Sequence, residues 1–104
     1  MEPKTYNKLV RDKIPEYLDG KSISYEKRIA TEKEYKEELI KKLDEEIKEF
    51  SEEGDIEELA DIMEVIEALK KIPEYEGVEE IRVKKLEARG GFEQRIILKG
   101  EYSK

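Results

Sequence analysis

The chain contains neither cysteine nor histidine. This excludes disulfides, zinc fingers, thiol nucleophiles and imidazole bases, so any catalytic chemistry must come from carboxylates, lysines, arginines or tyrosines. A bound metal would need oxygen ligands. Such ligands suit hard cations, which makes Mg²⁺ the expected cofactor of any metal site and Mn²⁺ its alternative.

Long apolar runs are also missing. Because the sequence has no run of about 18 apolar residues and no apolar segment near Met1, we expect no membrane span, no secretory signal and a cytoplasmic location. The formal net charge of −7 argues against a nucleic-acid polymer as partner, since binding one relies on dense positive charge. A small anionic ligand accompanied by a metal ion is compatible with this charge.

The apolar spacing predicts a mainly helical chain. The 104 residues fit one small domain, residues 1–104, with a single modest core. Capping residues and helix breakers divide the pattern into predicted helices over residues 15–20, 32–53, 55–72 and 78–90. The break between the two central helices is so short that they must form an antiparallel hairpin.

Two segments outside the helices alternate apolar and polar residues, which is typical of strands. The apolar positions are Ile23, Tyr25 and Ile29 in residues 22–30, and Phe92, Ile96 and Leu98 in residues 92–102. The two segments could pair with each other. The predicted fold class is therefore mainly α: an antiparallel helical hairpin core with additional short helices and a small β element.

Acidic residues border the apolar stripe of the first hairpin helix. At about 100° per residue, Glu46 lies roughly 20° from Leu39, within the edge of the stripe. Glu49 lies about 80° away, and Glu45 is turned out to about 120°. Glu46 and Glu49 should therefore border the buried face, whereas Glu45 should mostly face water.

The second hairpin helix has acids in equivalent places. Glu58 is in line with the apolar stripe, and Asp61 lies about 60° beyond it. An antiparallel hairpin brings these two acids to the height of Glu46 and Glu49, where four carboxylates would repel one another unless a cation is bound. The chain has 28 acidic residues, so this spacing also fits a solvated helix face, and Glu58 could instead form a capping box with Asp55.

The acidic motifs resemble those of a known family. "EEIKE" at residues 45–49, followed by "ELAD" at residues 58–61, is similar to the EExxE and ExxD pattern of the all-α nucleoside triphosphate (NTP) pyrophosphohydrolases, the MazG and phosphoribosyl-ATP pyrophosphohydrolase superfamily. "YNKLVRDKIPEYL" and "KKLEARGGFEQRIIL" resemble the flanking motifs of one branch, the phosphoribosyl-ATP pyrophosphohydrolase-like predicted house-cleaning enzymes. The resemblance spans nearly the whole chain and implies an all-α NTP pyrophosphatase-like fold.

The resemblance also implies an activity. Enzymes of this superfamily hydrolyse a nucleoside triphosphate to the monophosphate and pyrophosphate, with Mg²⁺ held by the paired acids of two helices. Carried over by position, the ligands here are Glu46, Glu49, Glu58 and Asp61, with Glu45 as an accessory acid. The superfamily works as dimers or tetramers whose pockets are often completed by a neighbouring subunit, which implies a homodimer or homotetramer.

The proposed chemistry needs a base and positive charge beside the metal. Glu45 and Glu49 are the candidates for taking the proton of the attacking water. The cations available in the flanking motifs to offset phosphate charge are Lys8, Arg11, Lys13, Lys85 and Arg89. Each of these could equally form a surface ion pair. Gly90 and Gly91 could approach a phosphate or simply end a helix, and Phe92 and Tyr6 could stack on a base or belong to the core.

Two other functions fit the same residues. The acidic hairpin could belong to a non-catalytic interaction or nucleotide-sensing protein, which predicts no Mg²⁺ binding at the four acids. Hydrolysis of phosphoribosyl-ATP itself is a further alternative, disfavoured because the flanking motifs resemble the other branch.

Overall fold

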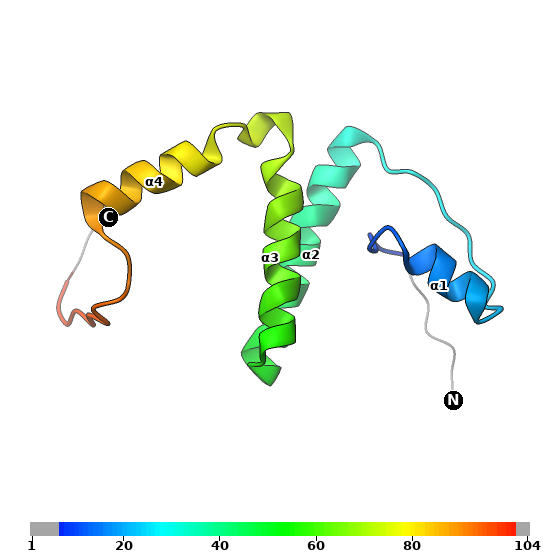
Figure 1. Cartoon of the computed structure of the whole chain (residues 1–104), viewed down its shortest axis with the longest axis horizontal. Coiled ribbons are helices and arrows are strands. Elements are labelled where there is room, and N and C mark those ends of the chain that lie inside the picture. Colours follow the sequence, from blue (N-terminus) through cyan, green and yellow to red (C-terminus); the bar gives the residue numbers. More distant parts are fainter. Residues whose placement is uncertain (1–6, 102–104) are drawn as a thin grey trace.

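The structure, a computed structural model, describes residues 7–101 and is mainly helical. Its elements are α1 (Ile14–Gly20), α2 (Glu32–Glu53), α3 (Ile56–Lys70), the short 3₁₀ helix η1 (Pro73–Tyr75) and α4 (Val78–Arg89) (Figure 1). The predicted helices are confirmed to within two residues at each end. In this part of the chain, none of the helices combines the length and apolar content needed to cross a membrane.

Local side-chain chemistry sets the boundaries of the two long helices. The Thr31 hydroxyl accepts a hydrogen bond from the Glu34 amide (3.2 Å) at the start of α2. Gly54 ends α2 in the left-handed conformation (φ 67°), and its N–H donates to the Phe50 carbonyl (2.8 Å). The next residue, Asp55, caps α3 by accepting from two backbone amides. Two residues therefore reverse the chain and force α3 to run back along α2.

The packed part of the molecule is the α2–α3 hairpin, whose helices lie side by side (Figure 1). Leu39 (3% exposed) and Val65 (8%) are the two buried apolar side chains among the described residues. The half-buried apolar residues around them include Leu43, Phe50, Ile62 and Leu69. The hairpin thus has a narrow seam rather than a full core.

The outer apolar face of the hairpin is uncovered. Ile47, Leu59 and Met63 are 44–59% exposed, and Ile56 at the start of α3 is 81% exposed. The chain exposes 10368 Å² in total, about 1.7 times the area that a compact monomer of its mass exposes. Its radius of gyration is 18.2 Å, against about 13 Å for a compact domain of this length. The apolar stripe of α3 is therefore covered on the side of α2 and open on the other.

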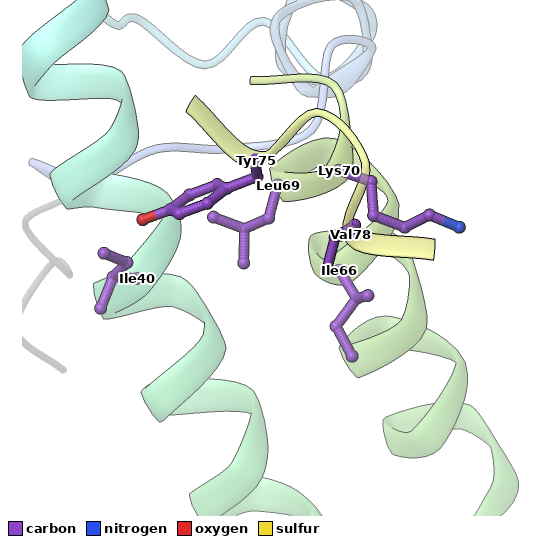
Figure 2. Close-up of a pocket in the computed structure, with 6 residues that line it drawn as sticks. All are labelled: Ile40, Ile66, Leu69, Lys70, Tyr75 and Val78. Atoms are coloured by element: carbon purple, nitrogen blue, oxygen red, sulfur yellow. The ribbon is translucent and has the colours of Figure 1, made fainter. Parts of the chain in front are cut away.

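The remaining helices lie on opposite sides of the hairpin, α1 on the side of α2 and α4 on the side of α3, pointing away from it (Figure 1). At the end of α3, an ion pair between Lys36 and Glu74 (2.7 Å) holds η1 against α2. An apolar hollow of about 280 Å³ lies there, lined by Ile40, Ile66, Leu69, Lys70, Tyr75 and Val78. In Figure 2 the Tyr75 ring lies toward Ile40 of α2, while the Lys70 amino group points away.

The predicted β element is not present in residues 7–101, where no strand forms. Residues 23–30 are extended, and residues 92–95 form a turn closed by the Arg95 amide and the Phe92 carbonyl (3.1 Å) before a short extended stretch. The end of the second predicted strand, residue 102, lies outside the described residues. The two segments do not pair because they lie at opposite ends of the molecule (Figure 1).

Candidate functional site

Among the described residues, Glu46 is the one charged residue that is buried, with 6% of its surface exposed. Lys42, one turn earlier on α2, places its Nζ 3.4 Å from Glu46 Oε1. The second oxygen, Oε2, is buried without a hydrogen-bond partner. Burial, and then the charge of Glu49, raise the pKa of Glu46 above its ordinary value. This carboxylate therefore favours a further cation or a proton.

Two of the other predicted ligands share this environment. Glu49 is exposed on α2 and Asp61 is half-buried on α3, and the negative charge of each raises the pKa of Glu46. Asp61 Oδ1 also accepts a hydrogen bond from Arg11 Nη2 at 2.6 Å. The hairpin thus brings Glu46, Glu49 and Asp61 into one electrostatic neighbourhood.

Glu58 interacts instead with the N-cap of its own helix. Asp55 accepts from the Glu58 amide (3.2 Å), and the hydrogen bond between the two carboxyl groups raises the pKa of Glu58 to about 7 while it lowers that of Asp55. One half of the predicted capping box is therefore observed, the hydrogen bond from the Glu58 amide to the Asp55 side chain. In the observed side-chain conformations of residues 7–101, no group of three or more acidic side chains is arranged to hold a metal ion. The four-ligand metal site stays a prediction.

The N-terminal segment brings two of the predicted cations to the acids. Lys8 Nζ lies 3.0 Å from Glu45 Oε1 on α2, and Arg11 pairs with Asp61 on α3. The hydrogen bond from Lys8 lowers the pKa of Glu45 and keeps it ionised. Glu45 is half-buried and Glu49 is exposed, which is the reverse of the order that their rotation about the helix predicts. Together, the two ion pairs hold residues 8–11 against both hairpin helices.

The other predicted cations are not brought to this place. Lys13 is exposed just before α1, and Lys85 and Arg89 are exposed on α4, which points away from the hairpin (Figure 1). Gly90 (φ 79°) follows α4 and donates its N–H to the Leu86 carbonyl, so it ends the helix. Phe92 is 96% exposed, so it does not belong to a core within this chain. Tyr6 lies outside the described residues.

A polar hollow beside the acids contains two cations that the sequence reasoning missed. It measures about 170 Å³ and is lined by Asn7, Lys8, Leu9, Glu38, Lys41, Lys42 and Glu45. Lys42 could have been found from its spacing, because a lysine four residues before Glu46 must lie on the same helix face. The hollow is lined by three lysines and two glutamates, and each lysine forms an ion pair with a glutamate. Its net positive charge makes it a candidate for anionic groups.

A search of protein-family models, of curated proteins and of solved structures found no significant match to this chain.

Proposed function

We propose that the protein is a Mg²⁺-dependent nucleoside triphosphate pyrophosphohydrolase with an all-α NTP pyrophosphatase-like fold. It would release nucleoside monophosphate and pyrophosphate, with non-standard nucleotides as the first substrates to test. The observation that carries the proposal is Glu46. A buried carboxylate with an unpartnered oxygen costs stability, and two further acids close to it add repulsion that a divalent cation would relieve.

The residues around Glu46 fit a hard cation. The acids Glu46, Glu49 and Asp61 come from two facing helices, and the atoms with which they would bind a metal are all carboxylate oxygens. Glu58 would complete the set by rotating away from Asp55. When bound, Mg²⁺ would neutralise triphosphate charge and lower the pKa of the attacking water.

The chain's own groups supply the base and the cations. Pairing with Lys8 makes Glu45 a weaker base, which favours Glu49 as the acceptor of the water's proton. Arg11 neutralises Asp61 in the metal-free chain. If Asp61 held a metal ion instead, Arg11 would be available to bind a phosphate, together with Lys41 and Lys42.

Pyrophosphate release from a panel of nucleotides with Mg²⁺ tests this proposal. We expect turnover of at least one member by the wild type, and a loss of about 100-fold or more in Glu46→Gln, since even outer-shell changes at metal sites cost 10–100-fold. Glu52→Gln is the matched control, because Glu52 is an exposed acid on the same helix. No release from any nucleotide, or equal rates for wild type and Glu46→Gln, would reject the enzymatic activity.

The orientation of Glu58 gives a specific reason to test a second function, a non-catalytic interaction or nucleotide-sensing protein. With Glu58 held by Asp55, fewer acids are free to bind metal. Thermal melting with Mg²⁺, with and without nucleotide, separates the two functions. A ligand that binds only the folded state must raise the midpoint, so a hydrolase requires a shift with Mg²⁺ and the non-catalytic alternative at these acids predicts none.

We also propose that the chain works as a homodimer or homotetramer. The apolar face of α3 and the hollow beside Tyr75 are exposed in one chain, and obligate interfaces bury about 2000–5000 Å² of such surface. In an assembly, Lys85 and Arg89 on α4 could contribute to a neighbouring subunit's site. Light scattering on the purified protein tests the proposal, and a monomer at micromolar concentration would reject it.

A further inference from the structure

Two segments of the chain lie outside the helices and expose apolar side chains. We call residues 22–30 the N-segment and residues 92–101 the C-segment. In the N-segment Ile29 is 93% exposed, and in the C-segment Ile97 is 92% and Leu98 72% exposed. In the described part of the chain, neither segment is part of a strand. Backbone amides and carbonyls that no strand partner satisfies can pair with another strand.

The N-segment is held in place at its start, where the Ser22 and Ile23 amides donate to the Asp19 and Leu18 carbonyls of α1 (3.1 and 3.0 Å). The Tyr25 hydroxyl donates to Asp19 at the end of α1 (2.8 Å). The Arg28 guanidinium donates to the Glu34 carboxylate in the first turn of α2 (2.6 Å for one of its two hydrogen bonds). A segment that is already fixed at two points loses less conformational entropy when a partner strand pairs with it. The N-segment is therefore prepared for a strand to be added.

The C-segment has the pattern to pair with it but cannot reach it in the same chain. The two segments lie at opposite ends of a molecule 54 Å long, with the hairpin between them (Figure 1). Ten residues of extended chain span about 33 Å at most. Pairing within one chain would require α4 to leave its place, whereas a second copy related by a two-fold axis can bring its own C-segment to the N-segment.

We infer that the N-segment of one copy pairs as a β-strand with the C-segment of a second copy, so that the β element missing from one chain forms twice between two chains. Both segments carry charges of mixed sign, Lys27 and Glu26 in one and Lys99 and Glu93 in the other, so no block of like charge opposes pairing. The pairing also covers Ile29 and Ile97. This inference depends on the self-association proposed above and not on the hydrolase activity.

Cysteine cross-linking tests the pairing cleanly, because the natural chain has no cysteine. Ile29→Cys is unfolded, refolded and oxidised together with a series in which each residue from Arg95 to Lys99 is replaced in turn, and linked peptides are identified by mass spectrometry. Lys27→Cys is a second reporter for a shifted register. Disulfides require Cα atoms within about 7 Å. Because successive strand side chains point to opposite faces, we expect links between the two chains at every second position.

Glu87→Cys, on the exposed surface of α4, is the matched control and should not link to either reporter. No link from either reporter, or links without alternation, would overturn the pairing, with circular dichroism confirming that each variant keeps its helices. A disulfide within one chain in the double variant Ile29→Cys/Ile97→Cys at high dilution would also overturn it. Wild-type turnover does not bear on these outcomes, so failure of the pairing and failure of the hydrolase proposal are read separately.

Discussion

Glu46→Gln should stabilise the metal-free protein while it abolishes the response to Mg²⁺. The substitution keeps the shape of the side chain and removes its charge. In the folded chain one carboxylate oxygen is buried without a partner, and Lys42 at 3.4 Å offsets only part of that cost. Gln is still polar but uncharged, so it removes the cost of burying a charge and the repulsion from Glu49 and Asp61. A net gain of about 1 kcal/mol is expected. For a domain of this size that raises Tm by about 4–8 °C.

The sign of the pH dependence follows from the raised pKa of Glu46. The folded chain holds its proton at higher pH than the unfolded chain does, so stability falls as pH rises from the ordinary pKa through the folded one. Gln cannot ionise. The advantage of Glu46→Gln should therefore be larger at pH 8 than at pH 4.

Thermal melting at both pH values, with EDTA and then with Mg²⁺, measures both effects. The wild type should gain Tm with Mg²⁺ and Glu46→Gln should not, whereas Glu52→Gln should behave as wild type in every condition. A Glu46→Gln protein that is less stable than wild type in EDTA at pH 8, or that still gains Tm with Mg²⁺, would refute the reasoning about this carboxylate.

Three further substitutions test other parts of the structure. Gly54→Ala should lower stability by about 1–2 kcal/mol, since a side chain in the left-handed region is strained, and chemical denaturation should show no such loss for Gly20→Ala in α1. In EDTA the wild type should lose stability as pH rises from 4.5, the ordinary pKa of Glu58, through about 7, its pKa in the folded chain, and Glu58→Gln should not show this loss. A Tm profile between pH 4 and 8 that is the same in both proteins would contradict the proton shared with Asp55. Arg11→Ala should lower kcat/KM for the nucleotide about tenfold or more with little change in Tm, because exposed ion pairs stabilise little; unaltered kinetics would remove Arg11 from the phosphate-binding set.

Helix boundaries were predictable because they depend on neighbouring residues. Thr31 accepts from an amide three residues on, and Gly54 and Asp55 reverse the chain within two residues. The burial of Glu46 was also predictable, since rotation about a straight helix fixes which face a side chain occupies. No information from distant parts of the chain is needed for these features.

Two kinds of feature were not predictable: those in which one side chain has two possible partners, and those that depend on another molecule. The Glu58 carboxyl group can interact with Asp55 or with the acids of α2, and spacing alone does not rank a local cap above a distant cluster. The pairing of residues 22–30 with residues 92–102 was expected from alternation, but alternation does not say which chain supplies the partner. The direction of α4, and with it the position of Lys85, does not follow from the apolar spacing within the helix.

The two-residue connection between α2 and α3 has a consequence for kinetics. Because Gly54 and Asp55 join helices whose contacts are close in sequence, the hairpin should close within microseconds to milliseconds. The surface left open on that hairpin can be covered only by collision with another molecule. On dilution from denaturant, helical signal should return at a rate independent of concentration, while the slower phase, in which the proposed subunits associate, should accelerate in proportion to the amount of protein present.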